Sequence, residues 1–171
     1  LHLGDNDIWD RGLEDLVASP LLRRVRVLTL NSNGFGAKGV QALSASPHLK
    51  NLQTLNLRDV RVGKEGVRAL ASAATLRNLR SLDLGKTESV FPNLRPTPIG
   101  PEGAKALAAS PHLVSLQSLI LTSNELRDEG VEALAASSTL KELRSLHLGS
   151  NSIGDRGFDA LVASPFLEKL Q

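Results

Sequence analysis

The chain has 171 residues and a formal net charge of +2, from 20 Lys and Arg against 18 Asp and Glu. This near-balance gives no electrostatic argument for a nucleic-acid-binding protein, and the absence of cysteine excludes disulfides, thiolate zinc sites and cysteine nucleophiles. No apolar run approaches the ~18 residues that a membrane helix needs, so we expect no membrane contact.

Leucine sets a repeat along the whole chain. The pair Leu-x-Leu begins at residues 1, 28, 55, 82, 119 and 146, so the spacing is 27 residues except for one interval of 37. The chain is therefore predicted to be a single domain built of six repeat units. Their bounds are 1–27, 28–54, 55–81, 82–118, 119–145 and 146–171, and the fourth unit carries a ten-residue insertion. Positions within a unit are counted from the first leucine of the pair. Such regularity indicates a repeat solenoid.

Each unit is predicted to hold one short strand and one helix. Period-two alternation, as in residues 28–31, indicates a strand whose leucines at positions one and three face the core. Small and apolar residues at helical spacing, as in residues 37–45, indicate an amphipathic helix. We expect the glycine at position twelve of every unit to let this helix lie close to the sheet. Leu84 and Leu107, one from each half of the unit, are expected to be fully buried.

The chain shows no pattern that indicates catalysis. The acidic run from Asp5 to Asp10 begins like a calcium loop but lacks the central glycine and the closing glutamate, so we expect it to cap the first helix. The histidines fall at equivalent positions several strands apart, too far to share a metal ion. No phosphate-binding glycine loop, nucleophile elbow or carboxylate pair with a reason to differ in pKa is present. We therefore predict a non-enzymatic protein with no metal and no cofactor.

The fourth unit departs from the pattern in residues 87–98. Asparagine stands at position six of four units but is replaced by Val60 and Thr87 in the two central ones, directly before a proline-rich insertion. One interpretation is a binding loop at the end of a strand, which would carry Phe91 and Arg95. The other is a tolerated surface insertion whose apolar residues cover the gap left by the missing asparagines.

Arg and Gln alternate at position twenty-six, from Arg26 and Gln53 to Gln171. This alternation either forms a polar ladder where the chain enters the strands or only records the duplication of a two-unit block. Both interpretations fit the pattern equally well.

These residues resemble the leucine-rich repeat of the ribonuclease-inhibitor-like type. The segment from Leu116 to Asn124 matches the family motif LxxLxLxxN in full, and the 27-residue units are similar to repeats of large bacterial proteins. The resemblance implies an α/β fold, a horseshoe-shaped solenoid with a parallel sheet on the concave face and helices on the convex face. It also implies a ladder of asparagines that satisfies backbone groups in the turns.

The concave face is the predicted binding surface. Side chains at positions twenty-seven, two and four are expected there, because those at positions one and three point into the core. A variable surface on a rigid scaffold suits protein recognition; the alternative is a solvated sheet without a ligand. The candidate partner-binding residues, including those of the insertion, are Asn56, Arg58, Asp83, Lys86, Phe91, Arg95, Ile120 and His147.

We predict a non-catalytic protein-binding scaffold that engages a protein partner and neither nucleic acid nor a membrane. Ran GTPase-activating proteins have similar repeats, so a GTPase regulator is an alternative, although their acidic terminal segment is missing here. A structural spacer within a longer protein is another. The lack of cysteine and of a glycosylation sequon favours a cytoplasmic location. Because both ends fall within strand segments, we expect an excerpt of a longer array that self-associates end to end.

Overall fold

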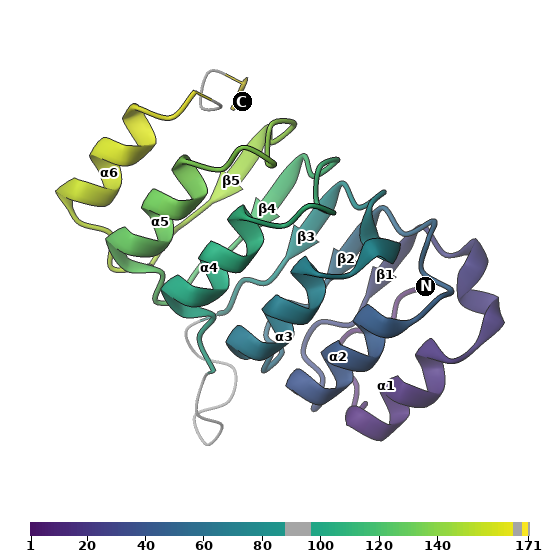
Figure 1. Ribbon diagram of the computed structural model, residues 1–171. Coiled ribbons are helices and arrows are strands. Elements are labelled where there is room, and N and C mark those ends of the chain that lie inside the picture. Colours follow the sequence, from purple (N-terminus) through teal and green to yellow (C-terminus); the bar gives the residue numbers. More distant parts are fainter. Residues whose placement is uncertain (88–96, 166–168, 171) are drawn as a thin grey trace.

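A computed structural model describes residues 1–87, 97–165 and 169–170, and in these residues helices and strands alternate along the chain (Figure 1). The helices are α1 (Asp10–Val17), α2 (Ala37–Ala45), α3 (Gly63–Ala71), α4 (Gly100–Ala108), α5 (Arg127–Ala135) and α6 (Asp155–Val162), with two 3₁₀ turns, η1 (Pro20–Arg24) and η2 (Ala74–Leu76). The strands are β1 (Val27–Thr29), β2 (Thr54–Asn56), β3 (Ser81–Asp83), β4 (Ser118–Ile120) and β5 (Ser145–His147).

The strands form one parallel sheet in chain order, from β1 to β5. Leu28 pairs with Leu55, and the same position continues through Leu82, Leu119 and Leu146. The ten additional residues of the fourth unit therefore leave the strand register unchanged. The predicted α/β fold with a parallel sheet is confirmed.

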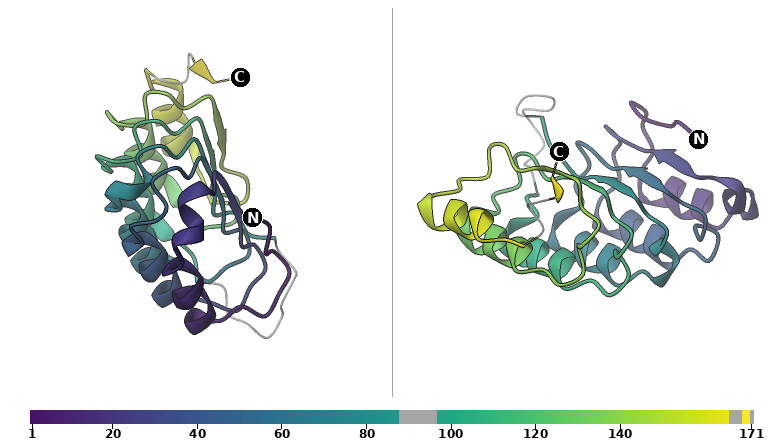
Figure 2. Two further views of the ribbon diagram at one scale, coloured as in Figure 1. Left: turned by 90° about the vertical axis from the view of Figure 1, so that its right-hand side faces the viewer. Right: turned by 90° about the horizontal axis from the view of Figure 1, so that it is seen from above.

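Helices make one layer and the sheet the other, and the stack bends with the strands on its inner side (Figure 2). Parallel strands stack ~4.8 Å apart, whereas packed helices need ~8–10 Å, so the stack curves toward the strands. The sheet face turned away from the helices is therefore the inner surface of the arc, and we call it the concave face.

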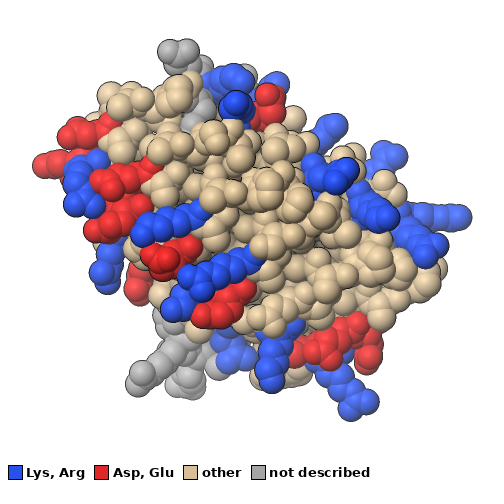
Figure 3. All heavy atoms as spheres, in the orientation of Figure 1, with Lys and Arg blue, Asp and Glu red and all other residues tan. Residues whose placement is uncertain are grey.

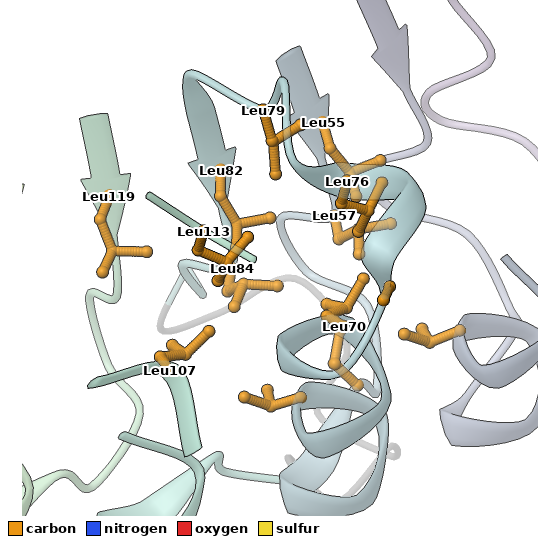
Figure 4. Close-up of a cluster of buried hydrophobic side chains, with 14 of the residues drawn as sticks. Leu55, Leu57, Leu70, Leu76, Leu79, Leu82, Leu84, Leu107, Leu113 and Leu119 are labelled. Carbon is orange, nitrogen blue, oxygen red and sulfur yellow. The ribbon is translucent and has the colours of Figure 1, made fainter. Parts of the chain in front are cut away.

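Leucines from the strands and the helices fill the space between the two layers (Figure 4). Leu82 and Leu107 are 0% exposed and Leu84 is 2% exposed, as the alternation predicts. Truncation of such a side chain to alanine typically costs about 2–5 kcal/mol of stability. Val60 is also only 2% exposed, so in the third unit apolar packing takes the place of the missing asparagine.

The glycine at position twelve makes a different close contact from the predicted one. A Cβ on Gly66 in α3 would lie 2.9 Å from Val62 of its own unit and 3.3 Å from Val40 in α2. A Cβ on Gly130 in α5 would lie 3.2 Å from Ala104 in α4. The glycine therefore lets neighbouring helices approach each other, and the prediction of a close approach to the sheet was wrong.

The prediction that the acidic run caps the first helix was also wrong. Among the described residues, no side chain caps α1. Oδ1 of Asp10 instead accepts hydrogen bonds of 2.8 Å from the backbone N–H groups of Gly36 and Gly39, at the start of α2. The first N–H groups of a helix have no partner within it, so the aspartate of one unit satisfies the helix of the next.

Serines at position nineteen bind the C-terminal ends of the helices of the preceding units. The hydroxyl of Ser46 donates to the carbonyl of Val17, and that of Ser137 to the carbonyl of Ala108, each at 2.6 Å. Both carbonyls belong to the last turn of the preceding helix, where intrahelical donors are missing. The first and second units are therefore joined at both helix ends as well as through the sheet.

Candidate binding surface on the concave face

Four of the predicted site residues lie in one row across the sheet. Asn56, Asp83, Ile120 and His147 occupy position two of successive units and are direct partners in the β2–β5 register. The leucines on either side of each face the core, so these side chains lie on the concave face. Neighbours in the row are one strand spacing, ~4.8 Å, apart, which places a polar, an acidic, an apolar and an imidazole side chain within one contact area.

Arg58 is held beside this row by two carboxylates. Its Nη1 lies 3.9 Å from Oδ2 of Asp83 and its Nε lies 3.8 Å from Oδ2 of Asp59. The two carboxylate side chains are 14% and 11% exposed, whereas that of Arg58 is 35% exposed. The backbone N–H of Arg58 donates to Oδ1 of Asn56 at 2.9 Å. The arginine therefore has two carboxylates as neighbours, and about a third of its side chain remains open to solvent.

A glycine at the end of β3 makes room for this arrangement. A Cβ on Gly85 would lie 3.1 Å from Oδ1 of Asp83, 3.2 Å from Cγ2 of Ile120 and 3.3 Å from Nη1 of Arg58. The backbone N–H of Gly85 also donates to Oδ1 of Asp83 at 2.9 Å. A side chain at this position would require these neighbours to move by a few tenths of an ångström, so Gly85 belongs to the site although it offers no side chain.

The charge of Asp83 is disfavoured by its surroundings. Burial raises the pKa of the Asp83 carboxyl above its ordinary value of 3.8, and the hydrogen bond from Gly85 and the charges of Arg58 and His147 oppose this rise. Desolvation penalises the ionised form, and hydrogen-bond donors and cations close by compensate for part of this penalty. The Arg58 guanidinium is such a cation, which couples the two residues electrostatically.

Lys86 lies at the end of the strand, where the insertion begins. Its Nζ donates to the carbonyl of Thr97, and its backbone N–H donates to the carbonyl of Thr122 at 3.0 Å. Burial lowers the pKa of the Lys86 amine to about 8, against the opposing charges of Glu125 and Asp59. This amine therefore changes its charge within about one pH unit of neutrality.

Asp59 and Gly85 are the two site residues that the sequence did not indicate. Asp59 has a positive φ of 59°, and its Oδ1 accepts hydrogen bonds from the backbone N–H and the hydroxyl of Thr87, at 2.6 and 3.0 Å. A signal did exist, because position five is Asp or Ser in every unit except the fourth, and these short polar residues favour the left-handed conformation and local hydrogen bonds. Phe91 and Arg95 lie outside the described residues.

The surface combines two basic side chains, two carboxylates, an amide, an imidazole and an apolar side chain. Such groups form ion pairs, hydrogen bonds and apolar contacts, which are the components of a protein interface. Within the described part of the chain, no three His, Asp or Glu side chains are grouped so that they could hold a metal ion. Every helix in that same part is too short or too polar to cross a membrane.

A family profile described as Leucine Rich repeat matches residues 23–44, 48–71, 112–135 and 138–162, together more than half of the chain. Each matched segment spans one strand and all or nearly all of the helix that follows it, while residues 1–22 and 72–111, the latter with β3 and α4, are not matched. No curated protein matches the chain.

Proposed function

Because the chain belongs to the leucine-rich repeat family, we propose that it is a non-catalytic scaffold that binds a protein through the centre of its concave face. The observation that carries this proposal is the position of Arg58, which Asp59 and Asp83 hold partly exposed beside Ile120. A residue fixed before binding loses little conformational entropy when a partner arrives. Arginine is also among the residues most enriched at energetic hot spots of interfaces.

The exposed side of the guanidinium defines what the partner should offer. A carboxylate or a backbone carbonyl of the partner would complete the hydrogen bonds of Arg58 that Asp59 and Asp83 leave open. Ile120 supplies the adjacent apolar contact, and His147 and Asn56 supply polar groups at the two ends of the row. We therefore expect a protein surface with an acidic side chain next to an apolar one.

The insertion belongs to the same proposed contact area. Its described ends are tied to the site, because Asp59 accepts two hydrogen bonds from Thr87 and Lys86 donates one to Thr97. We propose that the segment between them, with Phe91 and Arg95, adds contacts to the partner beside Lys86.

We further infer that residues 1–171 form one domain of six units of the ribonuclease-inhibitor-like type. An α-helix of eight or nine residues in each of the six units supports this subtype. The register that joins residues 27 apart in β1, β2 and β3 supports the unit boundaries.

Affinity capture with matched arginine variants tests the proposed function. The immobilised chain would be exposed to a lysate of the source organism, and bound proteins would be quantified by mass spectrometry for wild type, Arg58→Ala and Arg68→Ala. Arg68 lies on the convex helix α3, 3.8 Å from Glu102, so its variant removes the same side chain from the opposite surface.

We expect at least one protein to be retained by wild type and by Arg68→Ala and to be lost from Arg58→Ala. Loss of about one charge-assisted hydrogen bond should weaken binding about tenfold or more. Equal retention by all three proteins, or equal loss from both variants, would contradict a role for the concave face.

A further inference from the structure

The edge of the sheet at which the chain enters the strands carries a concentration of positive charge. The segments 20–27, 47–54, 74–81 and 111–118 lead into and include the first residue of β1 to β4, and they contain no Asp or Glu. Their basic residues are Arg23, Arg24, Arg26, Lys50, Arg77 and Arg80. We call this surface the basic edge. The net charge of +2 conceals it, because acidic residues elsewhere balance the total.

Charges on the convex helices are arranged differently. They interleave in ion pairs, such as Arg68 with Glu102 at 3.8 Å and Arg156 with Glu132 at 2.5 Å. Figure 3 shows red and blue groups side by side along the helices at the left, whereas blue groups at the upper right have no red neighbour. The basic edge therefore has an excess of positive charge that the convex helices do not have.

A cleft of about 160 Å³ lies in the middle of the basic edge. The residues that line it are all of polar types: Arg26, Asn51, Gln53, Asn78, Arg80 and Ser115. In the described part of the chain, neither Arg26 nor Arg80 forms an ion pair or a side-chain hydrogen bond. Two guanidinium groups and several amides thus surround a space whose described lining residues carry no negative charge.

The sheet determines the distance between the backbones of Arg26 and Arg80. Arg26 and Arg80 precede β1 and β3, and Gln53 precedes β2 between them. The backbone carbonyl of Arg26 accepts the N–H groups of Gln53 and Thr54, and the carbonyl of Gln53 accepts those of Arg80 and Ser81, at 2.7 to 2.9 Å. These bonds fix the two arginines two strand spacings apart, which is ~10 Å.

This distance matches one turn of an extended polypeptide. A polyproline II segment has three residues per turn and rises ~3.1 Å per residue, so side chains three residues apart lie on one face ~9 Å apart. We propose that the cleft and the basic edge bind an acidic protein segment in this conformation, with one carboxylate on Arg26, the carboxylate three residues later on Arg80, and Gln53 on the backbone between them.

The lining of the cleft favours an acidic protein over a single-stranded nucleic acid. Binding of unpaired bases relies on aromatic side chains on which the bases stack, and no aromatic residue lines the cleft. Amide side chains such as those of Asn51, Gln53 and Asn78 instead provide donors and acceptors for a peptide backbone. This site is separate from the Arg58 cluster, so the two proposals stand or fall independently.

Fluorescence anisotropy with a labelled peptide tests the proposal. The probe is a peptide of four Glu-Pro-Pro repeats, and its controls are the matching Gln-Pro-Pro peptide and an oligothymidine of equal charge. The proteins are wild type, the double variant Arg26→Gln with Arg80→Gln, and a matched double variant Arg68→Gln with Lys105→Gln. Both double variants remove two positive charges, but the second removes them from the convex face. Melting curves establish that all three are folded.

We expect the acidic peptide to bind wild type and the convex variant with similar affinity, and the cleft variant about fivefold to tenfold more weakly. The Gln-Pro-Pro peptide should not bind. Added salt should lower the affinity for the acidic peptide, because the arginines are exposed. No binding of the acidic peptide, or equal weakening by both double variants, would overturn the proposal. Binding of oligothymidine as tight as that of the peptide, with the same loss in the cleft variant, would overturn it in favour of nucleic acid.

Discussion

Oδ1 of Asp128 accepts a 2.7 Å hydrogen bond from the backbone N–H of Gly154, so a side chain in α5 caps the helix of the next unit. Asp10 makes the same bond to Gly36. In both receiving units position nine is extended, with φ of −100° at Gly154 and −125° at Gly36. In the third, fourth and fifth units, which receive no aspartate, position nine has a positive φ, at Gly63, Gly100 and Arg127. Trp9 of the first unit is extended, with a φ of −98°. From the second unit to the sixth, the aspartate and an extended position nine therefore occur together.

Removal of this cap should cost stability in proportion to one lost capping bond. We expect Asp128→Ala to lower the free energy of unfolding by about 1 kcal/mol in urea melts, the usual effect of deleting a helix cap. Asp159→Ala is the control, because this aspartate lies exposed on α6. Equal effects of the two substitutions would show that the bond to Gly154 contributes nothing.

The asparagines at position six should differ according to their burial. Asn124 is fully buried, and its Nδ2 donates to the carbonyls of Leu84, Leu121 and Thr122 while its Oδ1 accepts the N–H of Ile99. We expect Asn124→Ala to cost more than about 2 kcal/mol, because buried backbone groups lose their partners.

Asn6 is the matched control for this substitution. It occupies the same position in the first unit but is exposed, and within the described residues it donates to the carbonyls of Leu3 and Gly4 alone. We expect Asn6→Ala to cost less than about 1 kcal/mol in the same urea melts, since water replaces the lost bonds. A loss as large as that of Asn124→Ala would rule out burial as the source of the difference.

Stability should depend on pH through Lys86. The pKa of its amine is about 8 in the folded chain against an ordinary 10.5, so between these values the unfolded chain binds more protons. Through this group, the free energy of unfolding then rises as the pH rises across that window. Lys86→Met should abolish this contribution, and Lys86→Arg should retain a buried charge at both ends of the window. The measurement is urea denaturation of the three proteins at pH 8 and pH 10.5; an identical pH dependence for wild type and Lys86→Met would contradict the lowered pKa.

How much of this molecule follows from its sequence depends on the range of the interactions. The alternation of Leu28 and Leu30 predicts their burial directly, because it reflects contacts within one strand and its core. The bond from Asp10 to Gly36 joins residues 26 apart, and its direction depends on backbone angles that no local pattern reports. Arg58 and Asp83 were predicted as separate candidates, but the ion pairs of Arg58 with both Asp83 and Asp59 and the space provided by Gly85 depend on the fold.

The face of α6 that is turned away from α5 should promote self-association of the 171-residue chain. Phe158 and Val162 are 63% and 68% exposed, whereas the equivalent residues of the fifth unit, Val131 and Ala135, are 0% and 4% exposed against the next helix. We expect light scattering after size exclusion, at a concentration on the order of 100 μM, to detect assemblies, and Phe158→Glu to reduce them. A wild-type chain that remains monomeric at this concentration would contradict the expectation.

Site-specific photocrosslinking tests most directly whether the concave face binds a protein. A photoreactive amino acid placed at residue 120, between Asp83 and His147 in the sheet register, would be compared in cells of the source organism with the same amino acid at residue 68 on α3. We expect a discrete crosslinked protein from residue 120, absent from residue 68 and diminished by Arg58→Ala. A crosslink of equal yield from both residues, or none from residue 120 while residue 68 captures a protein, would contradict the assignment of the concave face as the binding surface.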